Sequence, residues 1–190
     1  GLHHGLATLE FGDPALKSER SIKWLNQFLF HYNEFFQADI TCYVNFIHNF
    51  IYLQPDSVPV LTIRGAFPAF HYKQTKAFLY GSDITVTALP FKFWKLGLKS
   101  SIVRGQNSSA DDWLIYMPGD NISASTELFT DWKQLKYLHL KAEVQHNFKQ
   151  TRTPANIKDF KDAPNAYTLL NMEIGTNISL HTKHQLGISL

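Results

Sequence analysis

The sequence predicts an all-β fold in which about eight strands form an antiparallel up-and-down meander. Segments of roughly ten residues alternate between apolar and polar side chains, which is the period of a strand with one buried face. The connections between these segments are alternately short and long, and aromatic residues gather near the segment ends. The pattern contains no amphipathic helix that could cover the apolar face of such a sheet.

Residues 21–32 and 38–50 are the first two expected strands, joined by a short turn at 33–37. Successive side chains of a strand point to opposite sides, so alternate residues share a face. One face is apolar in both strands, with Asn26 as the polar exception. Its apolar members are Ile22, Trp24, Phe28, Phe30, Tyr32, Ala38, Ile40, Cys42, Val44 and Phe46.

Residues 75–105 are expected to form the third and fourth strands as a hairpin with a tight aromatic turn. Pro90 ends the first of these strands because proline has no N–H to donate to the ladder. The alternation again separates an apolar face from a face of charged and small residues. The apolar face carries Ile84, Val86, Leu96 and Leu98, and the opposite face carries Asp83 and Lys99.

The remaining expected strands are 121–131, 138–147, 166–180 and a last one that begins at 185. Their apolar faces include Leu138, Leu140, Met172 and Ile174, and their polar faces include Lys141, Glu143 and Glu173. Short turns are expected at Asn33, Pro90, Trp132 and His181, and long connections after Phe50, Gly105 and Lys149. In an antiparallel meander this alternation puts all the short turns at one end of the sheet.

The composition excludes several classes of protein. The 190 residues carry a formal net charge of +2 with both signs interspersed, so no basic stripe for a nucleic-acid partner is present. No run of about twenty apolar residues exists, which excludes a transmembrane helix. The sequence contains no nucleophile elbow, no paired-cysteine metal site and no phosphate-binding loop, and we expect neither an enzyme nor a bound cofactor. The single cysteine, Cys42, is expected to be a small hydrophobe.

Alternating strands of about ten residues, with short turns at one end, long loops at the other and aromatic girdles, are typical of an outer-membrane β-barrel. In that fold, lipid covers the apolar face. A soluble β-sandwich is the open alternative, because its strands alternate as well. The mixed charges of the polar face and the strong asymmetry of the loops favour the barrel.

A resemblance to a known family rests on an ordered set of segments. They are GLHHGLATLEFGDPALKSERS at 1–21, YVNFIHNFIYLQP at 43–55, TKAFLYGSDITVTALP at 75–90, SIVRGQN at 101–107, LIYMPGDNIS at 114–123 and AYTLLNMEIGTNI at 166–178. In this order and spacing the chain resembles the C-terminal portion of the β-barrel of a TonB-dependent outer-membrane receptor. The resemblance covers essentially the whole chain.

The resemblance implies residence in the outer membrane of a Gram-negative bacterium and TonB-energised import of a scarce ligand, such as a siderophore, haem or zinc. Receptors of this family enclose a plug domain in a barrel of about twenty-two strands. We therefore expect residues 1–190 to be a single barrel segment, without the plug and without the closing C-terminal strands. The implied partners are outer-membrane lipid, the plug, TonB through the plug and the ligand. The alternatives are a small outer-membrane barrel enzyme or adhesin, and a soluble β-sandwich binding module.

Site residues follow from this reading. His3 and His4 are adjacent in an expected external loop and could contact a metal or metal chelate, although a loop histidine without such a role is the alternative. Asp111 and Asp112 lie in a long connection and are expected to be solvated. The expected lumen-facing residues are Asp83, Lys99, Lys141, Glu143 and Glu173. The expected lipid-facing residues are Ile84, Val86, Leu96, Leu98, Leu138, Leu140, Met172 and Ile174.

Overall fold

A computed structural model describes residues 2–3, 7–159, 162–181 and 184–189. Its strands are β1 (Leu2–His3), β2 (Thr8–Phe11), β3 (Arg20–Tyr32), β4 (Phe36–Pro55), β5 (Val60–Thr62), β6 (Gly65–Phe67), β7 (Ala69–Phe91), β8 (Trp94–Asn107), β9 (Asp112–Trp113), β10 (Asn121–Trp132), β11 (Leu135–Asn147), β12 (Tyr167–His181) and β13 (His184–Ser189). The described residues contain no helix that is long and apolar enough to cross a bilayer.

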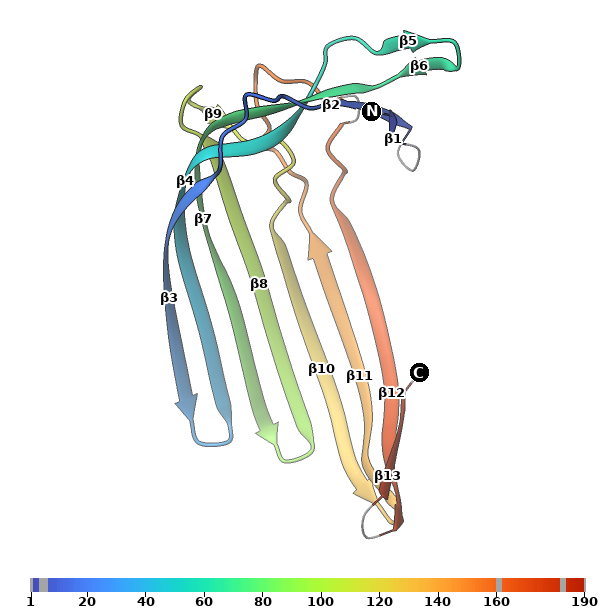
Figure 1. The fold of residues 1–190 in the computed structure, drawn as a ribbon. Coiled ribbons are helices and arrows are strands. Elements are labelled where there is room, and N and C mark those ends of the chain that lie inside the picture. Colours follow the sequence, from blue (N-terminus) through green and yellow to red (C-terminus); the bar gives the residue numbers. More distant parts are fainter. Residues whose placement is uncertain (1, 4–6, 160–161, 182–183, 190) are drawn as a thin grey trace.

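The eight strands β3, β4, β7, β8, β10, β11, β12 and β13 follow one another as an antiparallel meander. They lie side by side in one curved sheet (Figure 1). Along this meander the sheet begins at β3 and ends at β13, and among the described residues these two strands do not pair with each other. The predicted all-β meander is therefore confirmed.

Cross-strand register gives the sheet one apolar face, because residues directly opposite each other point to the same side. One row across six strands consists entirely of apolar residues: Ala38, Val86, Leu98, Ala124, Val144 and Leu170. We call this side the apolar face. The opposite side, which we call the polar face, carries a row of alternating charge made of Lys95, Glu127, Lys141 and Glu173.

The connections alternate as predicted. Two-residue or three-residue turns at 33–35, 92–93 and 133–134 lie at one end of the sheet, which we call the turn end. Connections at 56–68, 108–120 and 148–166 lie at the other end, which we call the loop end. Figure 1 shows the three turns together at the bottom and the long connections at the top. The fourth expected turn, between His181 and His184, lies outside the described residues.

Two strands extend further toward the loop end than the sequence predicts. Pairing of β4 with β7 shifts register between Ile47 and Phe50, where Asn49 has a φ of 58°, and then continues to Pro55 opposite Phe70. The predicted strand end at Phe50 was therefore wrong, because a β-bulge at this point interrupts the alternation without ending the ladder. Pro55 is tolerated at the last position of the strand, where its missing N–H costs no ladder bond.

His3 was expected to lie in an external loop, but its backbone belongs to β1, and β2 follows shortly after it. β2 pairs in parallel with β7, with Leu9 opposite Ala69. These strands are two and four residues long. Segments of this length are too short to show a period, so their pairing depends on the tertiary position of β7.

Buried hydrophobic residues are few and lie at the loop end. Among the described residues, Ile47, Ala77 and Leu114 form a small cluster, with Phe50, Leu79 and Met117 packed against it. Ala69 is buried as well. Along the apolar face, in contrast, Leu170 and Met172 are 65% and 71% exposed. Within the part of the chain that the structure describes, the sheet therefore has no protein core between the turn end and the loop end.

Candidate functional site

The structure places all the expected lipid-facing residues on the apolar face. Val86 lies opposite Leu98, Leu140 lies opposite Ile174, and Leu138 lies opposite Thr130 next to Leu140. The remaining members, Ile84, Leu96 and Met172, lie opposite Ile40, Thr126 and Ala142. Cys42 is on the same face and is exposed.

The expected lumen-facing residues share the polar face. Asp83 Oδ1 accepts a hydrogen bond from the Ser101 hydroxyl at 2.5 Å. Lys141 Nζ lies 3.5 Å from Glu143 Oε2 on the same strand. Glu173 Oε1 lies 3.3 Å from His139 Nε2. Lys99 lies between Thr85 and Ser123.

Sequence reasoning missed the most enclosed charge of the polar face. Glu127 is 9% exposed, lies 3.7 Å from Lys95 Nζ and accepts a hydrogen bond from the Tyr137 hydroxyl. The alternation marks Glu127 as polar, but the register of β8 brings Lys95 to it, and Tyr137 reaches it from an irregular stretch of β11. Opposite charges at cross-strand positions stabilise a sheet by a few tenths of a kcal/mol to about 1 kcal/mol each.

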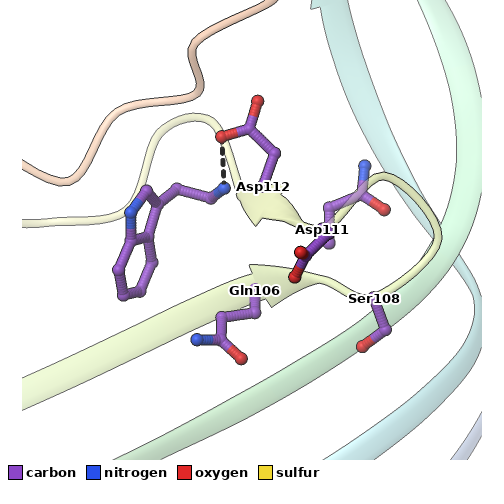
Figure 2. A pocket seen from close by; sticks show the side chains of 6 residues that line it. Gln106, Ser108, Asp111 and Asp112 are labelled. Carbon is purple, nitrogen blue, oxygen red and sulfur yellow. Dashed lines mark hydrogen bonds between the residues drawn. The ribbon is translucent and has the colours of Figure 1, made fainter.

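A pocket of about 380 Å³ opens at the loop end (Figure 2). Polar groups dominate its lining, which consists of Gln106, Asn107, Ser108, Asp111, Asp112 and Trp113. Asn107 is 7% exposed, and its Oδ1 accepts from the Thr75 hydroxyl and from the backbone N–H of Ser109. The turn that forms the pocket is therefore tied to β7 by a buried amide.

Asp112 is a structural acceptor, which corrects the expectation of a solvated carboxylate. Its Oδ1 accepts from the backbone N–H of Trp113 at 2.8 Å, as Figure 2 shows, and its Oδ2 accepts from the backbone N–H of Ala155 at 2.9 Å. Asp111 is exposed, as expected, and has a φ of 49°. The Asp112 carboxylate thus joins the connection after β8 to the connection after β11.

A second contact between these two connections is an ion cluster around Asp120. The Arg104 Nη2 donates to Asp120 Oδ2 at 2.9 Å, and Arg152 Nη2 donates to the same oxygen at 3.1 Å. The Arg104 guanidinium holds the pKa of the Asp120 carboxyl below its usual value, and Arg152 adds to this effect. Gln150 Nε2 also donates to the carbonyls of Met117 and Pro118.

No sequence signal indicates the Asp120 cluster, because its three members come from a strand and from two separate connections. Hydrogen bonds of the cluster and of Gln150 hold the connections at 114–120 and 148–155 against each other, and the small apolar core packs Leu114 and Met117 against β4 and β7. Such contacts give the loop end a defined surface around the pocket instead of independent loops.

The structure does not test the prediction that His3 and His4 contact a metal or a metal chelate. The backbone of His3 belongs to β1, and His4 lies outside the described residues. The described part of the chain holds no group of three or more His, Cys, Asp or Glu side chains placed to bind a metal ion. The backbones of His181 and His184 are opposite each other in β12 and β13.

Comparison with known proteins gives matches among solved structures. No family model matches the sequence, and no curated protein matches it. A copper transporter, OprC, superposes with a TM-score of 0.71 at 13% identity over 93% of this chain and 26% of that chain. Two mutants of the ferric enterobactin receptor PfeA from Pseudomonas aeruginosa superpose with a TM-score of 0.61 at 18% identity, over 90% and 92% of this chain.

The chain spans about a quarter of the length of these structures. At such identities the likeness concerns the fold, and it covers the whole meander described above. OprC and PfeA are TonB-dependent receptors. The chain therefore has the fold of a segment of the β-barrel of a TonB-dependent receptor.

Proposed function

We propose that this chain is part of the barrel wall of an outer-membrane receptor that imports a scarce ligand with energy supplied through TonB. The observation that carries the proposal is the apolar face, which has an entirely apolar row on six strands and is covered by no other part of the described chain. Lipid is the solvent that suits such a face. The match in fold to transport receptors gives independent support.

The structure weakens both alternatives. A soluble β-sandwich needs a second sheet packed on the apolar face, and the only other sheet among the described residues is the short β5–β6 hairpin at the loop end. A small closed barrel needs its first and last strands to pair, and the described β3 and β13 do not. Both observations favour a segment of a larger barrel wall.

The proposed orientation follows from the connections. Bacterial barrels have short periplasmic turns and longer extracellular loops, so the turn end faces the periplasm and the loop end faces outward. The polar face, with Asp83, Lys99, Lys141, Glu143 and Glu173, then lines the lumen and contacts water and the plug. Ligand meets the loop end first, where the pocket beside Asn107 lies.

We further propose that the ligand is a metal or a metal chelate. The His3–His4 pair supports this class, because imidazole is the commonest metal ligand among side chains. The two solved receptors that share the fold are named for copper and for ferric enterobactin. These names describe those proteins, and they motivate the choice of probes for this one.

Membrane insertion is tested with a fluorescent label at two neighbouring positions whose side chains point to opposite faces of the sheet. In the complete receptor with Cys42→Ser, a bimane label at Leu98→Cys should be quenched by lipids brominated on their acyl chains. The same label at Lys99→Cys should be quenched by aqueous iodide instead, because it lies on the polar face. Equal iodide quenching at both positions would contradict a lipid-facing apolar face.

Ligand capture is tested separately by replacing both histidines in the complete receptor. His3→Ala combined with His4→Ala should lower uptake of copper ion or of ferric enterobactin by about tenfold or more, which is the scale of losing groups at a metal site. His31→Ala, in β3 near the turn end, is the matched control and should leave uptake unchanged. Unchanged uptake of both probes in the double variant would exclude a role for the pair in capturing them.

A further inference from the structure

Side-chain size varies sharply along one row of the apolar face. Leu96, Thr126, Ala142 and Met172 lie opposite one another on β8, β10, β11 and β12. Two small side chains thus lie between two large ones, which leaves a hollow in the middle of the row. A pocket of about 420 Å³ occupies this hollow, with Thr126 and Ala142 in its lining.

The walls of this hollow are large apolar side chains. Phe91, Phe93 and Trp94 line it from the β7–β8 hairpin, and Leu128 and Leu140 line it from β10 and β11. The ring centroids of Phe91 and Phe93 are 5.6 Å apart and nearly parallel. Trp94 Nε1 donates to the Thr126 hydroxyl at 2.7 Å, so the floor and one wall are fixed to each other. The groove is therefore preformed and almost entirely apolar.

The groove continues along β10 away from the turn end. Ala124 is the next residue of β10 on this face, and it lies between Leu98 and Val144. The two small side chains of this line, Thr126 and Ala124, cover about 7 Å of β10 at the rise of an antiparallel strand. A narrow apolar groove of this length, parallel to the strands, fits several methylene groups of an extended hydrocarbon chain.

The turn end next to the groove carries uncompensated positive charge. Lys92 lies in the turn between β7 and β8, Lys133 lies in the turn between β10 and β11, and both are exposed. Among the described side chains no carboxylate forms an ion pair with either lysine. The neighbouring Asp131 carboxylate already accepts from Lys136 and from the backbone N–H of Tyr137. Because β8 and β10 pair, the two turns belong to adjacent hairpins.

We infer that this groove, made by Phe91, Phe93, Trp94, Leu128, Leu140 and the small residues between them, binds one acyl chain of an anionic phospholipid whose phosphate lies near Lys92 and Lys133. The inference rests on the proposed membrane location, in which the turn end is in the inner leaflet. The apolar channel accommodates the chain, and the lysines distinguish an anionic head group from a zwitterionic one. A bound lipid of this kind would fill the hollow that the β8–β10–β11 surface leaves in the barrel wall.

Native mass spectrometry of the complete receptor, taken from nanodiscs with equal amounts of phosphatidylglycerol and phosphatidylethanolamine, tests the inference. The unmodified receptor should retain phosphatidylglycerol preferentially. Lys92→Ala and Lys133→Ala should each lower the ratio of retained phosphatidylglycerol to phosphatidylethanolamine by about fivefold, the effect of one basic residue near a membrane surface. Ala142→Leu fills the floor and should abolish retention of both lipids.

Two control variants repeat the same changes elsewhere. Lys76→Ala removes an exposed lysine at the loop end, and Ala38→Leu enlarges a small residue of the apolar face on β4. Both should retain lipid like the unmodified receptor. Equal retention by the lysine variants and the unmodified receptor would overturn the inference. A change of oligomeric state in Ala142→Leu without loss of lipid would also overturn it, because the groove would then hold a second receptor.

Failure of the proposed function has a different signature. If the receptor inserts into the outer membrane and the labels behave as proposed at positions 98 and 99, a lack of lipid preference refutes only the groove. If the receptor does not insert, the membrane proposal and the groove fail together.

Discussion

Leu114 at the loop end is 3% exposed, whereas Met172 in the middle of the apolar face is 71% exposed. The loop end excludes water with its own side chains, packing Leu114 on Ile47 and Ala77 and tying Asp120 to two arginines. The sheet between the two ends has ladders of hydrogen bonds and no protein core. Apolar side chains are therefore buried by protein at the loop end and left exposed along the apolar face.

The largest predicted effect comes from a charge on the apolar face. Leu98→Arg should destabilise the receptor folded in a bilayer by about 3 kcal/mol, measured as a decrease in the free energy of unfolding, because the guanidinium would lie in hydrocarbon. Urea titration of the receptor in liposomes measures this change. Ser125→Arg, on the polar face opposite Glu143, is the matched control and should change that free energy little. Equal losses for both variants would contradict the difference between the two faces.

A smaller and local effect is expected at the loop end. Leu114→Ala removes a buried side chain and should destabilise the connection at 108–120 by about 2 kcal/mol, with no effect on the ladders of β10 and β11. Hydrogen exchange followed by mass spectrometry should show faster exchange in 108–120 alone. Leu61→Ala, at an 82% exposed position in β5, provides the control with the same chemical change. If exchange also rises throughout β10 and β11, the loop end and the sheet are one cooperative unit.

The smallest effect concerns the Asp120 cluster. Asp120→Asn should cost about 1.5 kcal/mol of local stability, the lower end of the range for a hydrogen bond to a charged group. The pKa of Asp120 is lowered in the folded chain, so its contribution is fully present above the unfolded pKa of about 4 and is lost as the pH falls through the folded pKa. Protection of 148–155, measured as the exchange rate relative to an unstructured peptide at the same pH, should therefore decrease below about pH 4 in the native receptor.

The Asp120→Asn variant should show this lower protection at neutral pH as well, without a further decrease below about pH 4. Asp111→Asn changes an exposed carboxylate in the same region and should retain the native pH dependence. An unaltered acid response in Asp120→Asn would assign the stabilisation of 148–155 to other groups.

The alternation of apolar and polar residues predicted the long strands, because a period of two is a local property of the chain. It also assigned Ile84 and Leu98 to one face and Asp83 and Lys99 to the other, and the register agrees with that assignment. Strand ends were less predictable: Phe50 lies at a bulge, and β4 continues to Pro55 because β7 is there to pair with it.

The loop end was beyond sequence reasoning for a different reason. Asp112 looks like any loop carboxylate until the connection at 148–159 brings the N–H of Ala155 to it. The Asp120 cluster joins residues that are 16 and 32 positions apart in sequence. Neither contact has a spacing that a local pattern could reveal.

By itself the sequence determined the strand period, the alternation of turns and loops and the separation of apolar from charged side chains, since each of these depends on residues close together in the chain. Only the tertiary structure decided which side chains meet across strands: the alternating charges of Lys95, Glu127, Lys141 and Glu173, the ordered loop end, and the groove over Thr126 and Ala142. Register and loop packing are long-range choices, and a shift of one residue would move every one of these side chains to the other face.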